Sequence, residues 1–102
     1  MAVKTKEDAT LALGRVADDK RFYCSDGCIY GSLSEMAGCL EHIDAGAFSH
    51  HVTSLNNDFA NWVRDIIHDD KLASDLMKAA NAADAARIVR YRIHWLQTKA
   101  HH

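Results

Sequence analysis

Apolar residues recur at intervals of three and four along most of this 102-residue chain, the spacing that places side chains on one face of an α-helix. The clearest case is Phe59, Trp62, Val63, Ile66 and Ile67, with polar residues between them. An amphipathic helix is therefore predicted to start near residue 57. Further helices are predicted over about residues 6–17, 33–43, 69–77 and 83–97, with a short helical turn over 44–52. The apolar residues expected to face the core are Leu11, Leu13 and Val16, then Leu33, Met36, Ala37, Leu40 and Ile43, then Leu72, Leu76 and Met77, and finally Ala85, Ile88, Val89, Trp95 and Leu96.

Three of these helices begin with a capping box, in which a small polar residue is followed three positions later by an acidic one. The pairs are Thr5 with Asp8, Ser32 with Glu35, and Asn81 with Asp84. Side-chain oxygens at such positions accept hydrogen bonds from first-turn N–H groups that have no helical partner. Asp44 is predicted to cap the short turn in the same way, and either Asp69 or Asp70 the helix that follows.

The segment 18–31, DDKRFYCSDGCIYG, interrupts the helical pattern. Its aspartates and glycines are poor helix residues, whereas its aromatic and branched residues favour extended structure. An extended connector near residues 20–30 is predicted, with aromatic side chains directed into the core and a small hairpin around the SDG turn. The chain has no proline and five glycines. The pattern therefore predicts an all-α fold, a compact single domain of five to six short, orthogonally packed helices with its core over about residues 5–98.

Charge, hydropathy and cysteine content argue against several classes of function. The formal net charge is −2, which gives no overall attraction to nucleic acid or an anionic membrane. No stretch approaches the roughly 18 apolar residues of a spanning helix, and the first ten residues hold no signal-peptide run, so a cytoplasmic location is expected. Three cysteines cannot all pair internally, and reduced thiols are expected. His101 and His102 are interpreted as the start of a purification tag and given no function.

The near-neutral total conceals an uneven distribution of charge. Residues 41–80 contain seven acidic and three basic residues, whereas residues 81–102 contain one acidic and four basic residues. Arg87, Arg90 and Arg92 lie on the last predicted helix. This helix is expected to lie against the acidic middle of its own chain or of a partner. A face that binds an acidic partner or a phosphate is the alternative.

Cys24, Cys28, Cys39 and His42 form the most tempting chemical pattern, C-x3-C-x10-C-x2-H. Zinc takes thiolate and imidazole ligands in a tetrahedral arrangement, and Cys39 and His42 can project from one side of a helix. However, the domain has enough apolar residues to fold without metal, and Cys39 lies beside the apolar face containing Leu40, where a free cysteine behaves as a small hydrophobe. A zinc site is therefore kept as an alternative.

His50 and His51 precede the helix predicted near residue 57. A histidine in this place can hydrogen-bond to a carboxylate or the backbone and lock the turn, and this structural role is preferred to metal binding or acid–base chemistry. Trp62 and Trp95 are both expected in the core, because each falls on the apolar face of its helix. There is no glycine-rich phosphate loop, HExxH or GxSxG motif.

The segments FYCSDG, SLSEM, FSHHV, NDFANWVRD and DDKLA occur in that order between about residues 22 and 76. In this respect the chain resembles a family of small prokaryotic, largely archaeal, proteins catalogued as a domain of unknown function, with the pattern FxxxDG … FxxHV … NDFANWVxD … DxxLA. The resemblance implies an all-α fold and no known activity. The family positions that it implies in this chain are Asp26, Gly27, His51, Asn57, Asp58, Phe59, Trp62, Leu72 and Ala73.

These observations favour a helical binding module, engaged in protein–protein interaction or assembly with another protein or with itself as a homodimer. No cofactor is expected. The second hypothesis is a metal- or small-ligand-binding module that uses the His and Cys residues, and an enzyme is the least favoured because no reacting group has an evident partner. A membrane or nucleic-acid partner is not expected. The candidate binding residues are His51, Asn57, Asp58, Asp26, Arg87 and Arg90.

Overall fold

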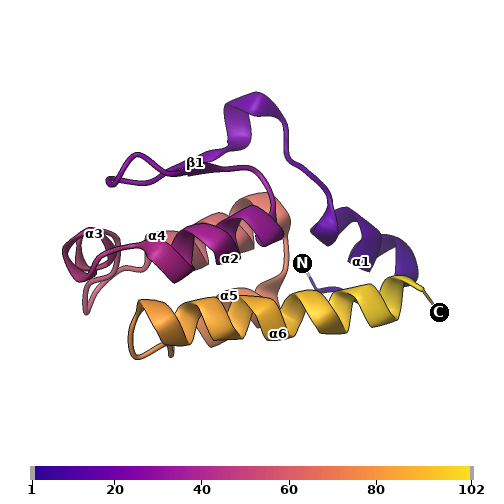
Figure 1. Cartoon of the computed structure of the whole chain (residues 1–102). Helices are drawn as coiled ribbons and strands as arrows, with labels where there is room; N and C mark the ends of the chain where they lie inside the picture. Colours follow the sequence, from indigo (N-terminus) through magenta and orange to yellow (C-terminus); the bar gives the residue numbers. More distant parts are fainter. Residues whose placement is uncertain (1, 102) are drawn as a thin grey trace.

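The computed structural model describes residues 2–101, which form six α-helices, a 3-10 turn, a π-helical segment and a two-stranded antiparallel sheet (Figure 1). The mainly helical prediction is confirmed, and the extended connector forms a hairpin that pairs Phe22 with Tyr30 and Tyr23 with Ile29. His102 lies outside the described residues, so its interpretation as a tag residue stays a prediction. In chain order the elements are α1 (Lys6–Leu13), η1 (Asp18–Lys20), β1 (Phe22–Tyr23), β2 (Ile29–Tyr30), α2 (Leu33–His42), α3 (Ala45–His51), α4 (Asp58–Trp62), η2 (Val63–Ile67), α5 (Asp70–Leu76) and α6 (Ala82–Ala100).

The predicted helix caps are present. Thr5, Ser32 and Asn81 each accept a hydrogen bond from the backbone N–H three residues later, and Asp44 caps α3. Asp69, and not Asp70, caps α5. The reciprocal part of the box forms at α1, where the Asp8 carboxylate accepts the Thr5 N–H. At α2 the carboxylate of Glu35 instead accepts the N–H of Gly31 and pairs with Arg15, which fixes the chain leaving the hairpin.

Two helices differ from their predicted extents. The first ends at Leu13 and not at Ala17, because Gly14 terminates it and the N–H of Val16 then bonds to the carbonyl of Gly31. The fourth begins at Asp58 as predicted, but after Trp62 it widens into the π-helical segment η2. Its last residue is followed by His68, whose N–H bonds back to the carbonyl of Val63.

His68 ends this helix in the left-handed conformation, with φ 68° and ψ 35°. A residue with a Cβ atom is disfavoured there by about 1 kcal/mol or more relative to glycine. His68→Gly is therefore expected to raise the free energy of unfolding by about 1 kcal/mol in urea denaturation. His68→Ala retains the Cβ atom and is the matched control, which should give no gain. Equal stabilisation by both variants would contradict an origin in the backbone.

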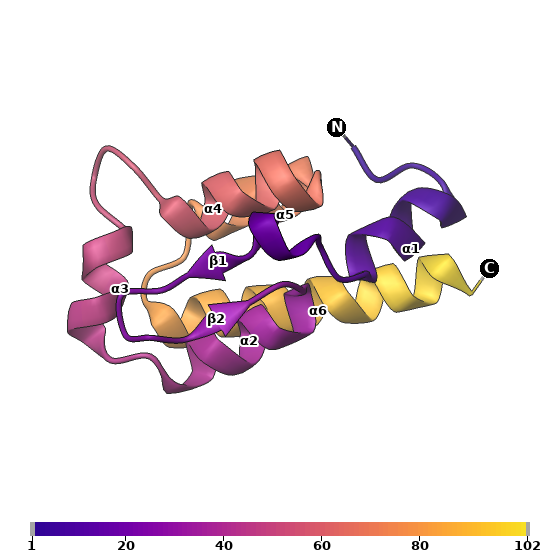
Figure 2. The same cartoon turned by 90° about the horizontal axis from the view of Figure 1, so that it is seen from above.

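The helices enclose the core from several directions. α2 packs along α6, while α1 packs against α6 near the C-terminus of the chain (Figure 1). The hairpin covers α2 and α4 on the side away from α6, and α3 lies across one end of the molecule (Figure 2). The axes of α2 and α6 run in similar directions in both views. The expectation of orthogonal packing therefore suits α3 but not this central pair.

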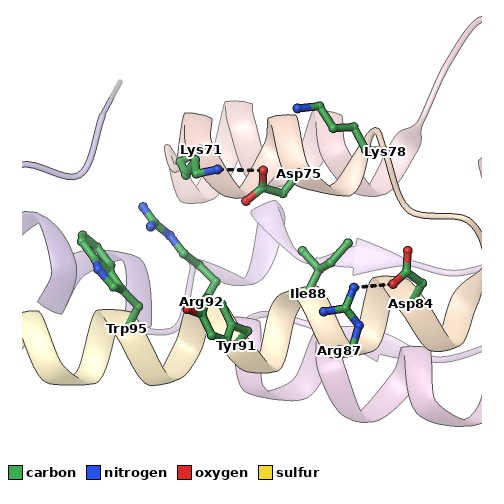
Figure 3. A pocket seen from close by; sticks show the side chains of 9 residues that line it. All are labelled: Lys71, Asp75, Lys78, Asp84, Arg87, Ile88, Tyr91, Arg92 and Trp95. Atoms are coloured by element: carbon green, nitrogen blue, oxygen red, sulfur yellow. Dashed lines mark hydrogen bonds and ion pairs between the residues drawn. The ribbon is translucent and has the colours of Figure 1, made fainter.

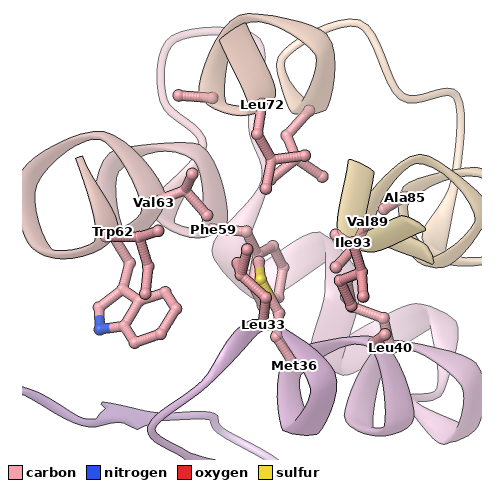
Figure 4. Packing of buried hydrophobic residues seen from close by; sticks show 14 of the residues in the cluster. Leu33, Met36, Leu40, Phe59, Trp62, Val63, Leu72, Ala85, Val89 and Ile93 are labelled. Carbon is pink, nitrogen blue, oxygen red and sulfur yellow. The ribbon is translucent and has the colours of Figure 1, made fainter. Parts of the chain in front are cut away.

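The core is a continuous apolar cluster between α2, α4, η2, α5 and α6 (Figure 4). Phe22 links the hairpin to it by stacking on Tyr30 and Phe59, with ring centroids 4.9 and 5.2 Å away. Three residues predicted to face the core are exposed instead, namely Leu11 (78% exposed), Met77 (65%) and Trp95 (39%). On α1 the buried residues are Ala9 and Ala12, on α6 they include Ile93 and Leu96, and Met77 lies after the last residue of α5. The buried residues shown by label are Leu33, Met36, Leu40, Phe59, Trp62, Val63, Leu72, Ala85, Val89 and Ile93.

Candidate functional site

His51 is a fixed structural group in this fold. Its side chain is largely buried, and its Nδ1 lies 3.0 Å from the Asp58 carboxylate. Its Nε2 accepts the backbone N–H of Ser25 at 3.0 Å. The acceptor role of Nε2 places the ring proton on Nδ1, where it is donated to Asp58. Phe22 and Phe59 meet the ring at 5.2 and 5.3 Å. Both nitrogens are thus engaged within the chain, and the ring joins the hairpin to α3 and α4.

Asn57 and Asp58 close the turn beside His51. The Asn57 side chain accepts the N–H of Ala60 and donates to the carbonyl of Leu76, so it caps α4 and also holds the end of α5. Asp58 accepts the side-chain amide of Asn56 at 2.7 Å in addition to His51. The polar side chains predicted to meet here therefore do so, and their hydrogen bonds are made to one another and to the backbone of the chain.

Asp26 shapes the hairpin turn. Its carboxylate accepts the N–H of Cys28 at 2.9 Å, and this bond, together with one from the Cys24 thiol, lowers the pKa of Asp26. Burial raises the pKa of the Cys24 thiol, which keeps the thiol protonated as the donor. Gly27 takes φ 92° in the same turn. Asp26 directly follows Ser25, whose N–H bonds to His51, but Asp26 makes no hydrogen bond to the histidine within the described residues.

The three cysteines do not form the expected set of reduced thiols. Cys28 and Cys39 are joined by a disulfide with their Cα atoms 6.3 Å apart, while Cys24 is free and buried. The disulfide connects the hairpin to α2. His42 is exposed on α2 one turn after Cys39. Between residues 2 and 101, no three His, Cys, Asp or Glu side chains are arranged to hold a metal ion.

The arginines of α6 have three different environments. Arg90 forms a two-pronged pair with Glu41 of α2, at 2.9 and 3.0 Å, which lowers the pKa of Glu41 and raises that of Arg90. Arg92 forms a similar pair with Asp69, whose side chain is fully buried. These pairs confirm that α6 faces acidic residues from the middle of its own chain. Arg87 instead lies on the surface and pairs with Asp84 at 2.6 Å.

A groove of about 480 Å³ lies between α5 and α6 (Figure 3). α6 contributes the apolar and aromatic side chains together with two arginines and Asp84, and α5 with the residues just after it contributes two lysines and Asp75. Tyr91 and Trp95 are 75% and 39% exposed, and the guanidinium of Arg92 lies 4.1 Å from the centre of the Trp95 ring. We call this surface the α5–α6 groove. Its lining residues are Lys71, Asp75, Lys78, Asp84, Arg87, Ile88, Tyr91, Arg92 and Trp95.

Ion pairs hold the two carboxylates of the groove in place. Lys71 pairs with Asp75 across one turn of α5 at 2.9 Å, and Arg87 pairs with Asp84 on α6. The N–H of Ala80 and the Arg87 guanidinium keep the pKa of Asp84 below its ordinary value, so this carboxylate stays charged. Both aspartates are thus neutralised locally, while the aromatic side chains of Tyr91 and Trp95 remain exposed.

The sequence did not lead to a prediction of this groove, although Arg87 was one of the predicted binding residues. A signal was present: Ile88, Tyr91, Trp95 and Lys99 follow one another at helical spacing and make a second stripe on α6. The first stripe contains Ala85, Val89, Ile93 and Leu96, all buried. Trp95 was predicted in the core because the two stripes were treated as one apolar face, and this prediction is wrong. Trp62 is buried as predicted.

Comparisons with protein-family models, with curated proteins and with solved structures find no match to this chain. The resemblance to the archaeal family of unknown function therefore stays a hypothesis. Within residues 2–101, every helix is too short or too polar to cross a membrane.

Proposed function

We propose that this chain is a helical protein-interaction module whose binding surface is the α5–α6 groove. The observation that carries the proposal is the exposure of Tyr91 and Trp95 in a groove that also presents arginine and lysine. Tyrosine, tryptophan and arginine are the residues that most often dominate the binding energy of protein interfaces. A helix pair with an open apolar stripe is also a common way to receive a peptide segment.

The polar cluster around His51 gives less support to a binding role. His51, Asn57 and Asp58 each use their polar atoms within the chain, as helix caps or as links between elements. A ligand at this place would have to break these bonds, and leaving buried polar groups unpaired costs about 1–3 kcal/mol each. Of the predicted binding residues, only Arg87 lines the groove, and Arg90 is engaged with Glu41.

A displayed library of 12-residue peptides, selected on the immobilised protein, would test the proposal. Selected peptides are expected to shift backbone amide resonances of α5 and α6 in a two-dimensional ¹⁵N NMR spectrum. They should also move the indole N–H signal of Trp95. The Trp62 indole is an internal control, because it is buried and donates to the carbonyl of Lys20 at 2.8 Å, so its signal should stay in place.

Substitutions distinguish peptide binding in the groove from nonspecific binding elsewhere on the surface. Tyr91→Ala and Trp95→Ala should each weaken selected peptides by about tenfold or more, as is usual for aromatic hot spots. Leu55→Ala is the matched control, because Leu55 is 95% exposed and lies outside the groove. Peptides that bind both alanine variants as tightly as the original chain, or that shift only resonances elsewhere, would contradict the proposal.

The remaining hypotheses have less support. A metal- or small-ligand-binding module built on Cys24, Cys28, Cys39 and His42 conflicts with the Cys28–Cys39 disulfide, which occupies two of the four donors. No observation favours an enzyme. A cytoplasmic location stays a proposal, and the disulfide is the observation against it, since structural disulfides are rare in reducing compartments.

A further inference from the structure

A second hollow, of about 440 Å³, adjoins the α5–α6 groove at Trp95. It is lined by Lys6 at the start of α1 and by Thr98 and Lys99 near the end of α6. The ammonium group of Lys99 lies 5.7 Å from the centre of the Trp95 ring. Because both hollows share the Trp95 side chain, they form one continuous surface along α6.

This continuous surface concentrates positive charge on a chain whose net charge is −2. Its lining contains six cationic side chains and two anionic ones. The two anionic residues are already paired with Lys71 and Arg87, and Arg92 is paired with the buried Asp69. Lys78 and Lys6 have no carboxylate partner within the described residues, and Lys99 has only its contact with Trp95. Unpaired cations therefore stand at both ends of the surface, with the exposed aromatic residues between them.

We infer that the partner is an acidic protein segment with an apolar centre; this inference rests on the proposed function. Its apolar side chains would cover Tyr91 and Trp95, and its carboxylates would meet Lys78 at one end and Lys6 and Lys99 at the other. Charge complementarity of this kind speeds encounter and selects among partners.

Carboxylates suit this surface better than a nucleic-acid backbone. Base stacking needs a free aromatic face, and Arg92 already lies over the Trp95 ring at 4.1 Å. A phosphate backbone carries charge at every nucleotide, so it would also pass close to Asp75 and Asp84. A peptide can place its carboxylates only beside Lys78, Lys6 and Lys99 and leave the stretch along Tyr91 and Trp95 uncharged. Single-stranded DNA is nevertheless the comparison that the test must contain.

Fluorescence anisotropy with defined probes tests the inference on the full chain. Three labelled 12-residue peptides share a leucine- and tryptophan-containing centre and differ in flanks of glutamate, glutamine or lysine; the fourth probe is a 12-nucleotide oligo(dT). The glutamate peptide is expected to bind about tenfold more tightly than the glutamine peptide, with the lysine peptide weakest. Raising NaCl from 0.05 to 0.3 M should reduce this advantage, because exposed charges are screened.

Charge reversals locate the contact. Lys78→Glu and Lys99→Glu should each weaken the glutamate peptide by about fivefold while changing the glutamine peptide little. Lys20→Glu is the matched control, an exposed lysine on η1 outside both hollows that should leave affinity unchanged. Thermal melts of all three variants check that each is folded.

The possible failures are distinguishable. Equal affinity for the glutamate and glutamine peptides, with NMR shifts in the groove, overturns the acidic partner and keeps the proposed function. Absence of groove binding by every peptide overturns both. Tighter binding of oligo(dT) than of the glutamate peptide overturns the inference in favour of nucleic acid. Self-association in light scattering that Trp95→Ala abolishes overturns it in favour of a second copy of this chain.

Discussion

Replacement of Asp69 by Asn is expected to lower the free energy of unfolding by about 3 kcal/mol, the effect of breaking a buried ion pair. Asparagine retains an oxygen that can cap α5 at Leu72, but its amide NH2 replaces the oxygen that accepts the Arg92 Nε–H, so the variant removes the charge and one acceptor of the pair. The Asp69 side chain is fully buried, and the Arg92 side chain paired with it is 12% exposed. The variant leaves a nearly buried guanidinium without its counterion. Urea denaturation followed by circular dichroism measures the loss.

A double-mutant cycle tests whether the cost comes from the unpaired charge. Adding Arg92→Met to Asp69→Asn should recover part of the loss, because a buried pair replaced on both sides costs far less than one broken on one side. A coupling energy of about 2 kcal/mol is expected. Asp75→Asn is the matched control, since it breaks an exposed pair with Lys71 on the same helix and should cost at most about 1 kcal/mol. Equal losses for Asp69→Asn and Asp75→Asn would contradict the argument.

Local rules in the sequence predicted the helices well. A cap depends on residues within one turn, so Thr5, Ser32 and Asn81 could be recognised from spacing alone. The same holds for the hairpin, whose turn was expected around the SDG sequence and contains Gly27 at positive φ. The extended connector and a small hairpin in it were predicted, but the register that pairs Phe22 with Tyr30 depends on two strands meeting and was not; the fold is therefore mainly helical with a small sheet, not strictly all-α.

The two tryptophans show where such rules stop. Trp62 and Trp95 both fall at apolar spacing on a helix, but only Trp62 is covered, by the hairpin aromatics Phe22 and Tyr30. Whether another element covers a helix face depends on how the whole chain packs, and the spacing of apolar residues along one helix does not reveal this. The partner of Asp69 is likewise 23 residues away on α6. The candidate site was therefore placed at the recognisable cap, whereas the open groove arises from the way α5 and α6 lie beside each other.

His51→Ala is expected to lower the free energy of unfolding by about 3 kcal/mol, because it leaves a backbone donor unpaired and a cavity in the aromatic cluster. The orphaned donor is the N–H of Ser25, and the cavity lies between Phe22 and Phe59. Hydrogen exchange adds a local measurement, in which the Ser25 amide should exchange faster than in the original chain under native conditions.

His50→Ala is the matched control for the His51 prediction. His50 is exposed and precedes His51 on α3; within residues 2–101 its side chain makes no hydrogen bond and meets only the edge of the His51 ring, at 5.1 Å. A surface substitution of this kind is expected to change stability by no more than about 0.5 kcal/mol. If His51→Ala unfolds at the same urea concentration as His50→Ala, the imidazole does not hold the hairpin. A partner for its two nitrogens would then have to be sought outside the chain, which would return His51 to the candidate binding residues.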